Sequence, residues 1–444
     1  MDTSNNCGTG GLRVSVKYID LFCGLGGIRL GFESALKSLG LVGEAVFSSE
    51  IKPHAIAAYR HNFGDTPSGD ITQIEADVLP CFDFLLAGFP CQAFSSAGRR
   101  LGFEDTRGTL FFEIARILKT KQPRGFLLEN VEGLVLHDNG NTLTTMTDIL
   151  KDLGYIVDWV VLDSKDFGLA QSRKRVYIFG ALNQEIILDA FTKKSAVLND
   201  IMDPRALPKA TPFTKKLLKH YQLKDVIGKK IKDKRGGDNN IHSWDFALKG
   251  KVTSAQKDLL SLMLKQRRNK KWADIHGIKW MDGMPLTLEM IATFYNTKNL
   301  KDMLEDLVKK GYLAYEHPKK RDGSKRVYDT DKQKGYNIVT GKLSFEYSKI
   351  LDPQDITPTL VATDVLRLGI PVGDGIRPMT TREGLRLFGF PESYDLEFLK
   401  LKEAFDLLGN TVCVPVIEYV SRCILKAVFV KGGGEGVTVA GAAL

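Results

Sequence analysis

The chain has 444 residues, which is long enough for two domains, because single hydrophobic cores stop growing at roughly 250 to 300 residues. Its composition, with 43% apolar and 26% charged residues, is ordinary for a soluble globular protein. No apolar run approaches the ~18 to 20 residues of a membrane span, and the N-terminus MDTSNNCGTGG lacks the pattern of a signal peptide, so we expect a cytoplasmic protein that does not bind membranes.

The positive charge is concentrated in one region. The formal net charge is +9, but residues 201–350 hold 33 Lys and Arg against 17 Asp and Glu, a balance of +16, while the remainder holds 29 against 36, a balance of −7. A solvated lysine-rich face would explain a single basic run. A whole basic region beside an acidic remainder favours contact with a polyanion.

Residues 14–190 predict a catalytic and cofactor-binding domain. After an N-terminal tail, residues 1–13, that we expect to be disordered, short apolar runs alternate four times with helical patterns, a rhythm typical of a doubly wound α/β fold with a mostly parallel sheet. Ligands of such folds collect at the carboxyl ends of the strands. The pairs are VKYIDLF and IRLGFESALKSLG, GEAVFSSE and HAIAAYRHNF, FDFLLAGF and TLFFEIARILKT, and RGFLLENV and NTLTTMTDILKDLG.

This rhythm ends near residue 190, and residues 191–400 predict a second, smaller, basic domain. Within it, TLEMIATFYN and NLKDMLEDLVKKGYL are typical of amphipathic helices, and a basic hairpin follows with its turn at Asp322-Gly323. This order favours a winged-helix-like insertion near residues 253–332, with an unrelated helical excursion as the alternative. Residues 401–430 predict a helical segment that returns to the first domain, and the Gly-rich residues 431–444 a second disordered tail.

A glycine-rich turn follows the first strand, in Asp20-Leu21-Phe22-Cys23-Gly24-Leu25-Gly26-Gly27. Glycines at this junction let a ligand approach the backbone and the positive end of the next helix. Glu50 ends the second strand, where an acid can hold ribose hydroxyls, and Asp70 can accept a hydrogen bond from an adenine amino group. The spacing differs from the G-x-G-x-x-G of a dinucleotide site and favours an adenosine ligand such as S-adenosylmethionine.

Cys91 follows Pro90 at the carboxyl end of the strand FDFLLAGF, where this architecture has its active site. The six cysteines have neither the paired spacing of a zinc site nor the density of a disulfide scaffold, so we expect reduced thiols and no metal. A cysteine is more often a core residue than a nucleophile. The strand-end position and the polar, basic loop SSAGRRLGFEDTRG that follows favour the nucleophile.

Charged groups end the neighbouring strands. Glu129, in ENV, ends the next strand and should stand beside Cys91, where partial desolvation can hold a proton on the carboxyl near neutral pH. Arg173 and Arg175, in QSRKR, alternate along the approach to the strand VYIFG, so their side chains can act together on one face. An exposed glutamate and an exposed basic edge are the alternatives.

These residues together resemble the DNA (cytosine-5) methyltransferases, most closely the bacterial enzymes of restriction-modification systems. The resemblance covers about residues 15–180 and 355–425, in the order of the family. DLFCGLGG resembles its first cofactor motif, GFPCQAFS its nucleophile motif, ENV its glutamate motif and QSRKR its arginine motif, and REGLRLFGFP and LLGNTV resemble its two closing motifs. LGNTV stands where LGNSV is commoner, and threonine preserves the hydroxyl. The basic middle region occupies the place of the variable target-recognition domain.

The resemblance implies that Cys91 is the thiolate that adds to cytosine C6, that Glu129 engages N3 and the exocyclic amine, and that Arg175 lies near the flipped base with Arg173 supporting it. The loop with Ser95, Arg99, Arg100 and Arg107 would close over the DNA. The implied cofactor is S-adenosylmethionine, bound by Phe22, Gly24, Leu25, Gly26, Glu50, Asp70, Ile71, Pro90, Leu110, Asn410 and Thr411.

The resemblance further implies a monomer that acts on double-stranded DNA in the bacterial nucleoid, with a cognate restriction endonuclease acting separately. Three alternatives compete with this interpretation. A nicotinamide dehydrogenase would leave Cys91, Glu129 and the arginines unexplained. A tRNA cytosine methyltransferase would have a more compact recognition region and different residues after the PC pair, and a non-catalytic DNA-binding protein would not need the intact motifs.

Overall fold

The computed structural model describes residues 15–89, 110–234, 236–237, 239–277, 283–322, 325–340, 345–361 and 365–429. The chain forms two compact units. The first contains the residues up to Asp203, Gln354–Val365 and the residues from Thr380 onward, and the second contains Pro204–Pro353 and Leu366–Met379. The range 191–400 that we expected for the target-recognition domain is therefore divided between the units. Its two ends belong to the first unit because they bond to each other, the backbone N–H of Asp203 donating to Glu383 Oε1 over 2.8 Å.

A six-stranded sheet forms the centre of the first unit, with the strand order β2-β1-β3-β4-β6-β5. The pairs β1–β2, β1–β3 and β3–β4 are parallel, and β6 is antiparallel to both of its neighbours. The predicted α/β fold with a mostly parallel sheet is confirmed. The strands are β1 (Ser15–Leu21), β2 (Val42–Ser49), β3 (Phe84–Gly88), β4 (Gly125–Val131), β5 (Ile156–Asp163) and β6 (Lys174–Ala181).

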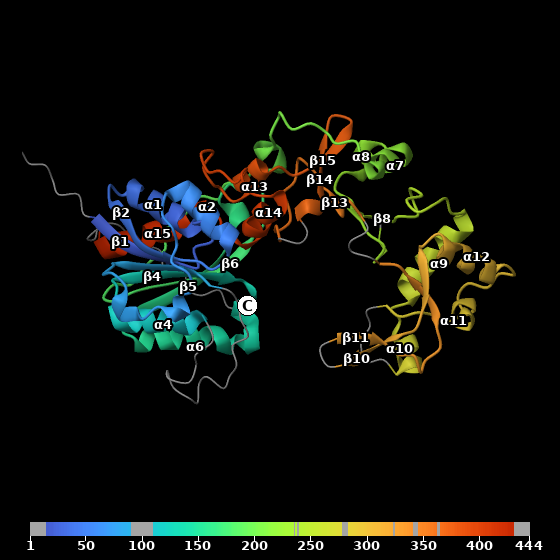
Figure 1. Ribbon diagram of the computed structural model, residues 1–444, viewed down its shortest axis with the longest axis horizontal. Helices are drawn as coiled ribbons and strands as arrows, with labels where there is room; N and C mark the ends of the chain where they lie inside the picture. The colour runs from blue at the N-terminus through green and yellow to red at the C-terminus, as the bar shows by residue number, and fades with distance from the viewer. Residues whose placement is uncertain are drawn as a thin grey trace, which may run out of the picture. The chain divides into compact units, whose positions relative to one another are not determined.

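Helices cover both faces of this sheet, as Figure 1 shows for α1, α2 and α15 on one side and α4 and α6 on the other. Successive strand residues point to opposite faces, so each strand needs apolar residues at nearly every position. Ile19, Leu85 and Phe126 pack with α4 and α6, whereas Tyr18 and Phe84 pack with Phe32 of α1. The helices are α1 (Gly27–Ser38), α2 (Pro53–Phe63), α4 (Leu110–Lys121), α5 (Gly133–Leu136), α6 (Asn141–Asp152), α13 (Thr381–Leu387), α14 (Leu401–Asn410) and α15 (Val414–Phe429).

The C-terminal helix α15 joins the core of the first unit although more than 200 residues separate it from β6. It packs lengthwise against α1, and the rings of Phe429 and Phe84 lie 5.9 Å apart. The segment between α14 and α15 is thereby brought to the start of α1. In the part of the chain that the structure describes, no helix is long and apolar enough to cross a membrane.

The second unit contains a five-stranded sheet with the order β15-β14-β13-β7-β8 and two antiparallel pairs, β9–β12 and β10–β11. Its helices are α7 (Pro212–His220), α8 (Leu223–Val226), α9 (Ser254–Gln266), α10 (Lys270–His276), α11 (Leu288–Ala292) and α12 (Leu300–Lys309). Its strands are β7 (Lys230–Ile231), β8 (Asn240–Ile241), β9 (Leu313–Glu316), β10 (Lys319–Asp322), β11 (Lys325–Tyr328), β12 (Gly335–Ile338), β13 (Lys349–Ile350), β14 (Leu368–Val372) and β15 (Gly375–Pro378).

Two separate apolar clusters stabilise this unit. One joins α7 and the five-stranded sheet through residues such as Leu217, Ile231 and Ile350. The other joins α9, α11 and α12 to β9 and β12 through residues such as Leu260, Leu304 and Ile338. The residues from α9 to β12 therefore have a hydrophobic core of their own.

Candidate active site

The glycine-rich turn leaves β1 in a conformation that few side chains tolerate. Phe22, Gly24 and Gly26 have positive φ angles of 55°, 52° and 69°. A Cβ at Gly26 would lie 2.4 Å from the ring of Phe63, so only glycine fits there. The turn directs the chain into α1 and leaves the backbone near residues 22 to 25 facing a cavity.

Glu50 is held rigidly at the end of β2 by three backbone groups. Its Oε2 accepts from the N–H of Gly24 over 3.0 Å, and its Oε1 accepts from the N–H groups of Ile51 and Lys52 over 2.8 and 2.9 Å. An ionised carboxylate has about four acceptor positions, so one remains for a ligand hydroxyl. The bond to Gly24 fixes the carboxylate against the glycine turn.

The segment between α14 and α15 closes the same region from the other end of the chain. A Cβ at Gly27 would lie 2.9 Å from Val412 and 3.0 Å from the Thr411 hydroxyl, which shows how closely α1 approaches this segment. Asn410 donates its side-chain N–H to the Asp406 carbonyl over 2.7 Å. Residues about 390 positions apart in the sequence therefore share one wall of the site.

A cavity of about 400 Å³ lies at the carboxyl ends of β1, β2, β3 and β4. Apolar side chains and polar groups share its wall, a combination typical of sites for small molecules and cofactors. Ten of the residues that the sequence predicted for the site line it: Phe22, Gly24, Leu25, Glu50, Leu110, Glu129, Arg173, Arg175, Asn410 and Thr411. Other lining residues were not predicted for the site, among them Ile51, Lys52, Asn130, Val131 and Leu407.

Asp70 and Ile71 do not line this cavity. The Asp70 carboxylate accepts from the backbone N–H of Thr72 over 3.0 Å and caps a short 3₁₀ helix, and Ile71 is buried in the core on the α4 side of the sheet. The predicted residues Pro90, Cys91, Ser95, Arg99, Arg100 and Arg107 lie outside the described residues.

Glu129 stands next to the last residue of β3, because the parallel register pairs it with Gly88. Only 8% of the residue is exposed, and Arg175 Nε lies 3.0 Å from its Oε1. Burial raises the pKa of the Glu129 carboxyl above its usual value, although Arg175 and Arg173 act in the opposite direction. The site therefore holds a carboxyl that takes up a proton more readily than an exposed glutamate does.

Asn130 has a role that sequence reasoning missed. Its side-chain N–H donates to the Phe89 carbonyl over 3.0 Å, and its Oδ1 accepts from the N–H of Val131 over 2.8 Å. The amide thus ties the chain that leaves β3 to the end of β4. Phe89 is the second residue of the nucleophile motif, two residues before Cys91, so the bond fixes the backbone at the start of this motif. The position of Asn130 directly after Glu129 in the ENV motif was the sequence signal that could have predicted this role.

Arg173 and Arg175 both line the cavity but have different partners. Arg173 is buried, and its guanidinium donates to the carbonyls of Leu360, Gly409 and Thr411 over 3.1, 3.0 and 2.9 Å. Burial, with Arg175 nearby, lowers the pKa of Arg173 to about 10. Arg173 therefore anchors the segment that carries Thr411, whereas Arg175 pairs with Glu129.

Asp20 is the buried acid beneath the glycine turn. It is fully buried, and the Tyr59 hydroxyl lies 3.5 Å from its Oδ2. Burial raises the pKa of Asp20 to about 7. The carboxyl is a structural group under the site and does not line the cavity.

An open, mostly parallel sheet with a glycine turn and a cavity at its strand ends defines an α/β enzyme that binds a ligand at that edge. A family model for the C-5 cytosine-specific DNA methylases matches residues 16–426, so the chain belongs to this family. It is a DNA (cytosine-5) methyltransferase, and the resemblance seen in its motifs is confirmed.

Similar proteins align over almost the whole chain. The Type II methyltransferase M.NlaIV of Neisseria lactamica is 54% identical over 418 residues, which are 92% of this chain and 99% of that protein. M.NgoBV of Neisseria gonorrhoeae is 53% identical with the same coverage. M.HgiCI of Herpetosiphon aurantiacus is 40% identical over 441 residues, covering 93% of this chain and 98% of that protein.

Proposed function

We propose that this enzyme transfers a methyl group from S-adenosylmethionine to C5 of a cytosine flipped out of a short, specific duplex sequence, through a covalent bond between Cys91 and C6. The observation that carries the proposal is the position of Glu129. This buried carboxyl with a raised pKa lies beside Gly88, three residues before Cys91, and lines the same cavity as the glycine turn.

The residues around the cavity fit the proposed cofactor. Glu50 has acceptor capacity left for ribose hydroxyls, and Phe22, Leu25 and Ile51 offer apolar surface to an adenine ring. The bound cofactor would supply an electrophilic methyl group on a sulfonium. Asp70 and Ile71 do not line the cavity, so direct contact between these two residues and the cofactor is not part of this proposal.

Cytosine C5 is a poor nucleophile until C6 is attacked. The Cys91 thiolate forms a bond to C6, the electron pair of the C5–C6 double bond moves toward N3, and C5 becomes enamine-like. C5 then gains the methyl group and loses its proton to a base, and the electrons of that C–H bond restore the double bond and expel the thiolate. A cytosine stacked inside the duplex is out of reach of Cys91, so it must be flipped out.

Glu129 stabilises the charge that develops on the ring. Its raised pKa favours a protonated carboxyl that donates to N3, while the second oxygen accepts from the exocyclic amine. Arg175, 3.0 Å from Glu129, orients that carboxyl and would contact the base. Arg173 is a positioning residue, because its Nη1 and Nη2 atoms donate to three backbone carbonyls. Ser95, Arg99, Arg100 and Arg107 would close over the DNA.

The names of the relatives, which describe them as Type II methyltransferases, support a role in restriction-modification. We propose that the enzyme is a cytoplasmic, nucleoid-associated monomer, and that it protects host DNA from a cognate endonuclease acting separately. The basic second unit would recognise the target sequence.

Bisulfite sequencing of DNA from bacteria that express the chain tests the proposal. We expect 5-methylcytosine in one short sequence context, and no methylation with Cys91→Ser. Cys81→Ser is the matched control, because Cys81 is exposed and does not line the cavity, and this variant should methylate normally. Unmodified DNA together with methylated tRNA would refute the choice of DNA as substrate.

A further inference from the structure

The segment from α9 to β12 has the chain order of a winged helix. A helix (α9) leads to an extended residue, Leu286, which exchanges two backbone hydrogen bonds with Tyr336 of β12 over 2.8 and 3.0 Å. The helices α11 and α12 follow, then β9, the hairpin β10–β11, and β12, which pairs with β9. Among the described residues of this segment, α10, between α9 and Leu286, is the additional element. In this arrangement α12 is the second helix of a helix-turn-helix, and β10–β11 is the wing.

In many helix-turn-helix proteins the second helix lies in the major groove. The residues of α12 do not suit a polyanion, because Leu300–Lys309 contains two lysines against three acids. Lys301 Nζ lies 3.9 Å from Glu305, and Asp306 binds Lys310. The exposed charges of this helix therefore largely cancel.

The wing has the opposite character. Residues 319–328 contain five Lys and Arg against one acid. Lys319, Lys325 and Arg326 are exposed, and the ammonium of Lys319 lies 4.9 Å from the centre of the exposed Tyr328 ring. Lys320 is partly neutralised, because its ammonium is 3.0 Å from Asp329. The wing thus offers exposed cations beside an aromatic side chain, a combination found at nucleic-acid contacts.

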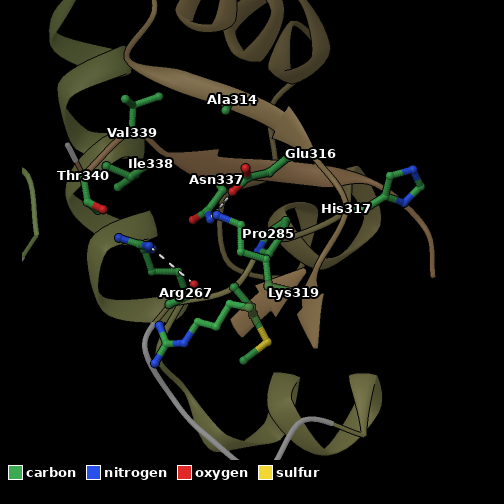
Figure 2. Close-up of a pocket in the computed structure, with 13 residues that line it drawn as sticks. Arg267, Pro285, Ala314, Glu316, His317, Lys319, Asn337, Ile338, Val339 and Thr340 are labelled. Atoms are coloured by element: carbon green, nitrogen blue, oxygen red, sulfur yellow. Dashed lines mark hydrogen bonds between the residues drawn. The ribbon is translucent and has the colours of Figure 1, made fainter. Parts of the chain in front are cut away.

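A hollow of about 350 Å³ lies between the wing and the sheet of β9 and β12, as Figure 2 shows. Among the described residues, Lys319, Arg326 and the buried Arg267 line it together with a single acid, Glu316. That acid already accepts from the Tyr328 hydroxyl over 2.9 Å and from the Asn337 side chain over 2.8 Å. The hollow therefore extends the positive surface of the wing toward the body of the insertion.

We propose that this winged-helix insertion contacts the phosphate backbone of duplex DNA through the wing and the hollow at its base, and that α12 makes no major contribution to DNA affinity. This inference rests on the proposed function. The carrying observation is charge complementarity, since the wing is strongly basic and α12, in the same small body, is not.

A matched pair of triple variants tests the inference in the full-length enzyme. The wing variant is Lys319→Gln, Lys325→Gln and Arg326→Gln. The control is Lys298→Gln, Lys301→Gln and Lys309→Gln, which removes the same charge from exposed positions on and next to α12. A labelled duplex that contains the target sequence of the enzyme is titrated with each protein, and its affinity is measured between about 50 and about 200 mM salt.

We expect the wing variant to bind more weakly and its slope of log affinity against log salt to become shallower by about 2 to 3, because each lost phosphate contact contributes about 0.9. The control should keep the wild-type slope. A charge-conserving wing, with Lys319→Arg, Lys325→Arg and Arg326→Lys, should also keep the wild-type slope, which excludes misfolding of the hairpin as the cause.

Equal losses in both triple variants, or a larger loss in the control, would overturn the inference while leaving the proposed function intact. A wild-type enzyme that neither binds nor methylates duplex DNA would instead refute the proposed function, and the inference with it.

Discussion

Replacement of Arg173 by methionine tests whether this side chain anchors the site or acts in the chemistry. Methionine keeps an unbranched apolar stem near Phe388 but removes all donors. Three buried carbonyls, of Leu360, Gly409 and Thr411, lose hydrogen bonds of 2.9 to 3.1 Å from a cation.

Each such bond contributes about 1.5 to 3 kcal/mol to stability, and relaxation of the freed segment recovers part of the sum. We therefore expect the Arg173→Met variant to lose about 3 to 5 kcal/mol of unfolding free energy, a large part of the 5 to 15 kcal/mol that folded domains have. Cofactor binding should weaken as well, because Asn410 and Thr411 line the cavity.

Urea unfolding followed by circular dichroism measures the first effect, and titration calorimetry with S-adenosylmethionine measures the second. Lys174→Met is the matched control, because this adjacent lysine is half exposed and makes one ion pair, 3.4 Å from Glu132. Such pairs contribute about 0 to 1 kcal/mol. If the two variants differed by less than about 1 kcal/mol, the anchoring role of Arg173 would be refuted.

Two further predictions concern the glycine turn. Burial raises the pKa of Asp20 to about 7, whereas an unfolded aspartate has a pKa of about 3.9, so between these values the native state binds a proton that the unfolded chain has released. The unfolding free energy should therefore fall as pH rises from about 4 to about 7. Asp20→Asn should remove this fall in unfolding free energy with pH. Urea midpoints of the two proteins measured across this pH range test the prediction, and a variant with the same pH profile as the wild type would contradict it. Gly26→Ala should weaken cofactor binding severalfold more than Gly64→Ala. Both residues have positive φ angles, but only a Cβ at Gly26 would meet a ring, that of Phe63, at 2.4 Å. Equal effects of the two substitutions in titration calorimetry with the cofactor would disprove this steric argument.

Much of the catalytic half could be predicted because its signals are local. Apolar runs that alternate with helical patterns predicted the parallel sheet, and in such a sheet the ends of the strands must share one edge. Glu50, Glu129 and the glycine turn were therefore predicted to lie together, and in the structure they surround one cavity.

Other assignments depended on contacts that no local pattern encodes. Asp70 was predicted as a cofactor ligand, yet it lies between α2 and β3 and its carboxylate caps the following 3₁₀ helix. Arg173 and Arg175 share a face by strand periodicity, but one bonds to carbonyls from residues 360, 409 and 411 and the other to Glu129. Partners nearly 240 positions away cannot be read from spacing.

The sequence by itself determined the class of fold, the family and the identity of the chemical groups, because strand alternation and short motifs are properties of neighbouring residues. Tertiary structure alone decided which groups are buried and with what they pair. The raised pKa of Glu129 and the anchoring of Thr411 by Arg173 arise from desolvation and from distances between segments far apart in the chain.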